Sequence, residues 1–116
     1  MSIIHSIGKN LTANTLTTLF TVPTRNLAKV TNILVSNHST SAKHITVYWY
    51  DASANVSIEV LFEYNLTSKN FLILDNGFYF MMDEGDQLRA ISQTGSTTTI
   101  IASFEIEQRS SVQQFS

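Results

Sequence analysis

The 116-residue sequence has no cysteine, one proline and four glycines, and each scarcity excludes something. Without cysteine these residues form no disulfide, no thiolate metal site and no cysteine nucleophile, although the compartment stays open. The four glycines, Gly8, Gly77, Gly85 and Gly95, are too scattered for a glycine-rich phosphate-binding loop. Pro23 marks a break between strands, because proline lacks the backbone N–H that a central strand needs.

Charge and long apolar runs are also scarce. Charged residues make up 14%, the formal net charge is -2 and the pI is near 5.8. The seven basic residues are scattered, so we expect no nucleic-acid partner. No apolar run approaches the length of a membrane span, and the start lacks a signal-peptide pattern. We therefore expect a soluble protein made in a cytoplasm, with no membrane partner.

Alternating polarity is the main positive signal. Between Thr97 and Glu107 apolar and polar residues alternate, and only Ile101 breaks the order. This period of two is typical of a strand with one buried face. Similar short segments separated by polar turns predict further strands at 15–22, 28–37, 43–51, 56–64 and 71–74.

The regular spacing of these segments predicts an all-β fold, a single-domain antiparallel β-sandwich or jelly roll of about eight strands. We expect one domain over residues 1–116, with the core at about 11–107, an N-terminal lead at 1–10 and a C-terminal tail at 108–116. The lead is either a first strand or an arm, and the tail is either an arm onto a neighbouring subunit or a frayed end.

Three expectations concern individual strands. Segment 15–22 carries a one-residue irregularity, and 28–37, apolar on both faces in its second half, should be a strand that is buried at its centre. Because only a short polar turn separates 28–37 from 43–51, the two should form a hairpin. In 56–64 the alternation predicts that four residues face the core, with Glu59 and Glu63 on the solvent side: Val56, Ile58, Val60 and Phe62.

Apolar residues near the two ends are candidates for contacts between subunits. An arm that crosses onto a neighbour needs such anchors, and the ends supply Ile3, Ile4, Ile7, Val112 and Phe115. In Tyr48-Trp49-Tyr50, Trp49 should enter the core while Tyr48 and Tyr50 share the outer face. That outer pair could contact another subunit or stack on a sugar, and we favour the subunit contact.

Chemical motifs are few. Asp83, Glu84 and Asp86 place three carboxylates in four residues, which could bind a hard cation such as calcium. Gly85 among them instead favours a tight turn in which the aspartates accept backbone hydrogen bonds. The histidines, His5, His38 and His44, have no ligand spacing, and no G-x-S-x-G motif is present. We therefore predict no catalytic residue, no metal, no cofactor and no enzymatic activity.

Three stretches carry a resemblance to a known group. They are TVPTRNLAKVTNILVSN at 21–37, HITVYWYD at 44–51 and FMMDEGDQLRA at 80–90. This order resembles small β-sandwich virion proteins of tailed bacteriophages, and the likeness covers about 16–107. G-D-x-L turns also occur in unrelated jelly rolls, and the bulky segment 79–82 departs from the group's pattern.

The resemblance implies a non-enzymatic building block of a phage particle. Such proteins decorate or cement a capsid, or belong to the tail, collar or fibres, and they act as symmetric oligomers. The expected partners are copies of the chain and other virion proteins, namely the major capsid protein or tail proteins, and the expected location is the virion, assembled in the host cytoplasm. A small glycan-binding module is the alternative outside this class.

Overall fold

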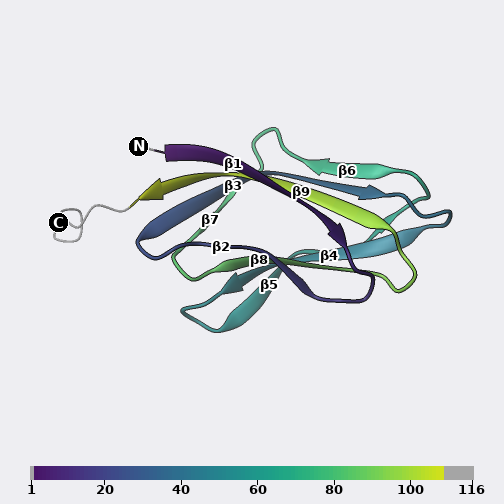
Figure 1. Cartoon of the computed structure of the whole chain (residues 1–116), viewed down its shortest axis with the longest axis horizontal. Coiled ribbons are helices and arrows are strands. Elements are labelled where there is room, and N and C mark those ends of the chain that lie inside the picture. Colours follow the sequence, from purple (N-terminus) through teal and green to yellow (C-terminus); the bar gives the residue numbers. More distant parts are fainter. Residues whose placement is uncertain (1, 109–116) are drawn as a thin grey trace.

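The computed structural model describes residues 2–108, which form nine strands in two antiparallel sheets packed as a sandwich (Figure 1). The strands are β1 (Ser2–Leu11), β2 (Thr17–Thr21), β3 (Asn26–Asn37), β4 (Lys43–Asp51), β5 (Val56–Leu66), β6 (Phe71–Leu74), β7 (Phe80–Met82), β8 (Gln87–Ser92) and β9 (Thr98–Gln108). The predicted all-β sandwich is confirmed. Val112 and Phe115, in the predicted C-terminal tail, lie outside the described part of the chain.

Each sheet has its own strand order. The five-stranded sheet runs β1-β9-β3-β6, with β7 pairing beside β6 along β3, and the four-stranded sheet runs β2-β8-β4-β5. Segment 2–11, which could have been an arm, is strand β1 and pairs with β9 in continuous register from Ser2↔Glu107 to Leu11↔Thr98. The irregularity expected in 15–22 is confirmed, between Thr18 and Phe20 in β2.

The core lies between the sheets and draws on both. The largest fully buried side chains include Phe104, Ile33 and Met82 of the five-stranded sheet and Ile45 and Leu88 of the four-stranded one. The alternation predicted for β9 is confirmed, because Thr98, Ile100, Ala102 and Phe104 are buried and Ile101 is exposed. The burial expected at the centre of β3 is confirmed at Val30, Ile33 and Val35. The strand pairs with β9 on one side and with β6 and β7 on the other.

The expected hairpin between β3 and β4 is wrong. The two strands belong to different sheets, and the connection 38–42 crosses from one to the other. Asn37, which is 1% exposed, secures this crossing: its Nδ2 donates to the carbonyls of Ser41, Leu66 and Thr67 at 3.0–3.2 Å, and its Oδ1 accepts from Ser39 N at 2.9 Å. Five residues easily span the distance of about 10 Å between packed sheets, so a short turn does not by itself specify a hairpin.

The core face expected for 56–64 is wrong in most positions. Only Val60 of the four predicted residues packs against the core, together with its neighbour Leu61, while Val56, Ile58 and Phe62 are exposed. Register irregularities between Ile45 and Val47 and between Val47 and Tyr48 interrupt the period of two. Ile58 still lies opposite the half-buried Trp49, but the opposing sheet leaves this end of β5 uncovered.

Candidate functional site

The acidic turn between β7 and β8 is a structural connection. The Asp86 carboxylate, in a residue 2% exposed, accepts hydrogen bonds from Trp49 Nε1 at 3.0 Å, Asp83 N at 2.9 Å and Ala52 N at 3.0 Å. Glu84 Oε1 accepts from Arg25 N at 2.8 Å, and Gly85 has a φ of 84°. The carboxylates therefore serve backbone and indole donors, as a tight turn requires. Within residues 2–108, no group of three or more His, Asp or Glu side chains is arranged to hold a metal ion.

The aromatic residues of β4 serve different purposes. Trp49 packs against the core, where its ring lies 5.9 Å from that of Phe80, as expected. Tyr50 is already engaged, because Arg89 Cζ lies 4.1 Å from its ring centroid and its hydroxyl is 2.5 Å from Asn55 Oδ1. Tyr48 lies in a groove of the outer face. The two tyrosines therefore do not form one open aromatic platform.

The free edge of β1 is a candidate for a protein contact. Its other edge pairs with β9, and no described strand pairs with this one. Ile3 and Ile4 are 54% and 76% exposed, whereas Ile7 packs against the core. An unpaired strand edge offers a row of backbone N–H and C=O groups to a second chain.

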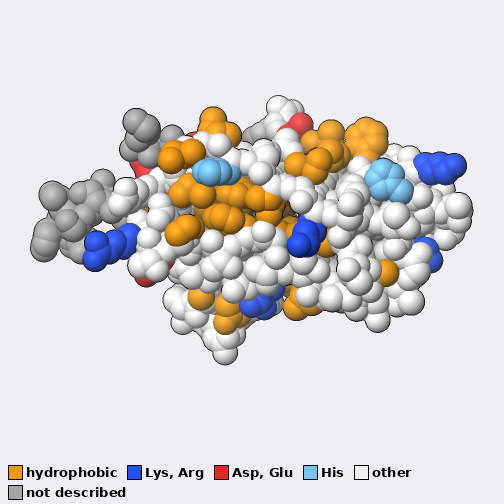
Figure 2. Space-filling model, viewed as in Figure 1, with side chains coloured by type: hydrophobic (Ala, Val, Ile, Leu, Met, Phe, Trp, Pro, Cys, Tyr) orange, Lys and Arg blue, Asp and Glu red, His pale blue; other side chains and the backbone are white. Residues whose placement is uncertain are grey.

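An apolar seam lies between β1 and the edge strand of the other sheet, β2. Figure 2 shows hydrophobic side chains gathered in the gap between these two strands. By register, Ile3 and Ile7 of β1 and Phe20 of β2 extend from the sandwich side of their strands, and the ring centroid of Phe20 lies 4.2 Å from that of the core residue Phe104. The seam therefore joins the exposed edge to the core.

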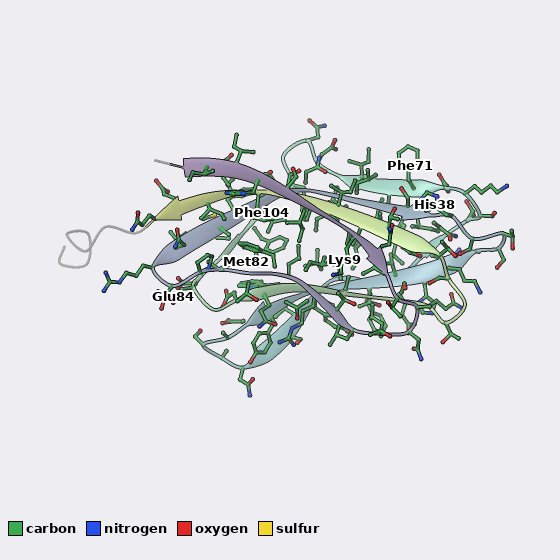
Figure 3. The ribbon with its side chains drawn as sticks, viewed as in Figure 1. Lys9, His38, Phe71, Met82, Glu84 and Phe104 are labelled. Carbon is green, nitrogen blue, oxygen red and sulfur yellow. The ribbon has the colours of Figure 1, made fainter. Side chains whose placement is uncertain are left out.

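Two polar residues on the same side of β1 limit how the edge can be used. His5 stacks on Phe104 with ring centroids 6.0 Å apart, and Lys9 lies opposite the buried Ile100, so it starts from the sandwich face of the strand (Figure 3). Inward charges on edge strands oppose indiscriminate pairing. The half of β1 that carries Ile3 and Ile4 is therefore the half that can more readily pair with a strand of a second chain.

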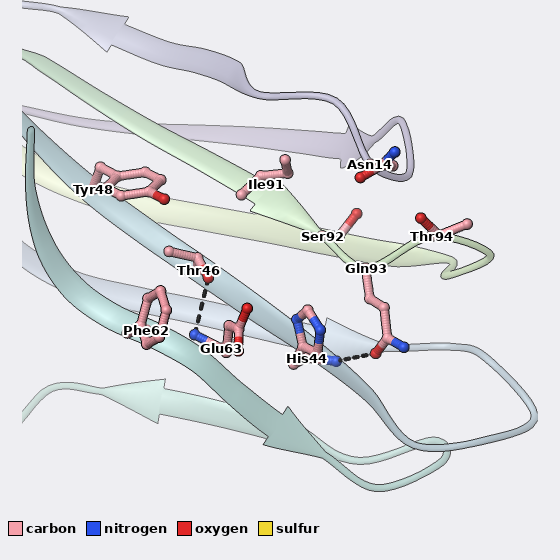
Figure 4. A pocket seen from close by; sticks show the side chains of 10 residues that line it. All are labelled: Asn14, His44, Thr46, Tyr48, Phe62, Glu63, Ile91, Ser92, Gln93 and Thr94. Atoms are coloured by element: carbon pink, nitrogen blue, oxygen red, sulfur yellow. Dashed lines mark hydrogen bonds between the residues drawn. The ribbon is translucent and has the colours of Figure 1, made fainter.

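A groove opens on the outer face of the four-stranded sheet and has a volume of about 380 Å³ (Figure 4). His44, Thr46 and Tyr48, alternate residues of β4, form its floor. Phe62 and Glu63 of β5 line the groove as well. Glu63 has a φ of 46° and donates its N–H to Thr46 Oγ1 at 2.9 Å, which holds this part of β5 against the floor. Alternation along the sequence did not identify Phe62 and Glu63 as groove residues. The apolar run Val60-Leu61-Phe62, which breaks the alternation, was a signal of the irregular pairing in β5.

The geometry defines an antiparallel β-sandwich domain with open sheet edges, and none of its described segments is a helix that could cross a membrane. No protein-family model and no curated protein matches the chain in sequence. A solved structure described as "Bacillus endospore appendages form a novel family of disulfide-linked pili" superposes with a TM-score of 0.53 and 10% identity, covering 95% of this chain and 88% of that one. At this identity the likeness shows a shared fold.

Proposed function

We propose that this protein is a non-enzymatic structural subunit that assembles with copies of itself. The observation that carries the proposal is the free edge of β1, with Ile3 and Ile4 exposed beside an apolar seam. Exposed apolar residues on an unpaired edge favour addition of a strand from a second chain. The shared fold with a structure described in terms of Bacillus pili supports self-assembly.

The chemistry of the contact must differ from that of the described pili. Those are disulfide-linked, whereas these 116 residues contain no cysteine. We propose that copies associate without covalent bonds, through main-chain pairing at β1 and apolar contacts at the seam. The tail 109–116 follows β9, whose end lies opposite the start of β1 (Ser2↔Glu107), and its Val112 and Phe115 are our candidates for anchors on a neighbouring copy.

For the biological setting, we propose a bacteriophage virion protein, most simply a capsid decoration or cement protein that stabilises the particle. A tail, collar or fibre-associated protein is the second candidate. The support is the sequence resemblance over 21–37, 44–51 and 80–90, and the proposed partners are the major capsid protein or tail proteins. The proposed location is the virion, after assembly in the host cytoplasm.

Self-assembly is tested by measuring the mass of the purified chain by light scattering over a range of concentrations. We expect concentration-dependent oligomers, and Ile4→Lys should shift the association midpoint at least about tenfold because it places a charge on the edge. The control, Phe71→Lys on β6, changes another exposed apolar side chain (57% exposed, against 76% for Ile4) away from β1. A chain that stays monomeric at every concentration would contradict the proposal.

Two further measurements separate the parts of the proposal. A Val112→Ser, Phe115→Ser double variant tests the tail: association weakened by this variant but not by Ile4→Lys would move the contact from the edge to the tail. Mass spectrometry and cryo-electron microscopy of purified phage particles test the setting. A trimer at capsid threefold sites would favour decoration, a hexamer or dodecamer would favour the tail, and absence from particles would remove the virion role while leaving self-assembly standing.

A further inference from the structure

We propose that the outer-face groove of the four-stranded sheet binds a neutral saccharide. This goes beyond self-assembly and does not depend on it, because the groove is built from β4, β5 and β8 and the proposed contact uses β1. The groove volume of about 380 Å³ falls within the range of roughly 300–1,000 Å³ that is usual for small-ligand sites.

Aromatic rings supply one part of the groove. Phe62 is 60% exposed, and Figure 4 shows its ring and that of Tyr48 toward the same end of the groove. A sugar ring presents a C–H face that packs on an aromatic face, while its hydroxyls remain at the rim. An exposed phenylalanine beside a half-buried tyrosine therefore suits this face of a pyranose.

Polar groups supply the other part. Gln93 Oε1 accepts from His44 N at 2.9 Å, an arrangement that leaves the Gln93 side-chain amide N–H groups as donors. The Glu63 carboxylate is an acceptor, and His44 Nδ1 is a buried nitrogen with no hydrogen-bond partner among the described residues. Hydroxyl groups both donate and accept, so a saccharide matches this mixture. Among the described residues neither Lys nor Arg lines the groove, which disfavours an anionic ligand.

The backbone of the groove wall is held in an unusual conformation. Glu63 has a positive φ of 46° although it is not a glycine, and its hydrogen bond to Thr46, a residue 4% exposed, fixes it there. Such strained residues concentrate at ligand sites, where surrounding contacts hold side chains ready. Here the strain turns Phe62 and Glu63 toward the floor formed by β4.

The proposal is tested by ¹⁵N-HSQC titration of the full chain with maltotriose, cellotriose and chitotriose. We expect amide shifts confined to 44–48, 61–64 and 91–94 for at least one of the three. Phe62→Ala and Glu63→Gln should each weaken that binding about tenfold, since each removes one ring contact or one charged acceptor. Phe71→Ala, an exposed phenylalanine on the other sheet, and Ile4→Lys should leave it unchanged.

Several outcomes would overturn the assignment. They are the absence of shifts at millimolar sugar, shifts that map outside the groove, or binding by both groove variants that is as strong as binding by the unchanged protein. Lysine methyl ester serves as a competing probe, because an aromatic pair beside a carboxylate could also hold an ammonium group. If this amine binds more tightly than every sugar, the groove is a site for a cationic ligand and not for a saccharide.

Discussion

Strands β9 and β5 are both eleven residues long, and apolar and polar residues alternate in both, yet the apolar side chains of β9 are mostly buried and those of β5 are mostly exposed. β9 lies between β1 and β3, and its inward apolar residues Ile100, Ala102 and Phe104 are buried. Among the described strands β5 pairs with β4 alone, and Val56, Ile58, Phe62 and Tyr64 are exposed. Alternation therefore specifies the face of a side chain where the strand pairing is regular, whereas burial depends on what covers that face.

The two strands also differ in regularity. β9 pairs with β1 without interruption, while the β4–β5 pairing has two irregularities and a left-handed residue at Glu63. Bulges are common at sheet edges, where they twist a strand and make it less receptive to further pairing. In this molecule the regularly paired β1 is therefore better suited than β5 to pair with a strand of a second chain, while the irregularity of β5 creates a groove.

The largest test of the comparison is the same substitution in both strands. Phe104→Ala should lower the free energy of unfolding by about 3–5 kcal/mol, because it leaves a cavity beside Phe20, whereas Phe62→Ala should change it by less than about 0.5 kcal/mol. Urea denaturation at fixed protein concentration measures both. Similar losses for the two variants would show that Phe62 is covered in solution and would remove the contrast between β9 and β5.

The second test concerns what holds the β4–β5 end of the sandwich. Asp86→Ala should cost about 3 kcal/mol, because it leaves three N–H donors, from Trp49, Ala52 and Asp83, without their carboxylate acceptor. Asp75→Ala, at an exposed aspartate, is the control and should be nearly neutral. Hydrogen exchange should localise the loss to 49–56. A uniform loss of protection across both sheets would mean that the turn does not specifically anchor this hairpin.

Much of the fold followed from local patterns. The number of strands, the inner residues of β9 and the acidic turn were predictable because alternation and turn chemistry act over a few residues. The Asn-Gly turn after β6 has positive φ at both positions, 58° at Asn76 and 101° at Gly77, a conformation that this residue pair tolerates. These features depend on the residues themselves and on their immediate neighbours.

Pairing partners and the groove were not predictable in the same way. Whether 38–42 turns back or crosses to the second sheet depends on distant carbonyls at Leu66 and Thr67, which accept from Asn37. The groove depends on a bulge that brings Phe62 and Glu63 over Thr46, and alternation assigned these two residues to opposite faces. Such features arise from contacts between strands that a one-dimensional pattern does not contain.

A third, smaller test uses adjacent isoleucines of β9. Ile100→Val should lower the free energy of unfolding by about 1 kcal/mol, since Ile100 is 1% exposed, while Ile101→Val should leave it nearly unchanged at 42% exposure. Ile101 lies on the outer face, opposite Gly8 on β1 and Leu34 on β3. Thermal unfolding of the two variants is sufficient. An equal loss at Ile101 would indicate that a second copy covers this face, and the loss should then depend on protein concentration.

The smallest expected effect tests whether the irregularity of β5 is strained. Glu63→Gly should stabilise the fold by about 0.5 kcal/mol, because glycine adopts a φ of 46° without the crowding that a Cβ introduces, and its greater freedom in the unfolded chain offsets part of the gain. The same change removes the carboxylate from the groove, so saccharide binding should weaken while stability rises. Lys69→Gly, at another exposed residue with positive φ of 60°, supplies the backbone control and should stabilise without altering binding. If Glu63→Gly destabilises the fold while Lys69→Gly does not, the Glu63 side chain supports the bulge. The groove would then owe its shape to that side chain and not to backbone strain.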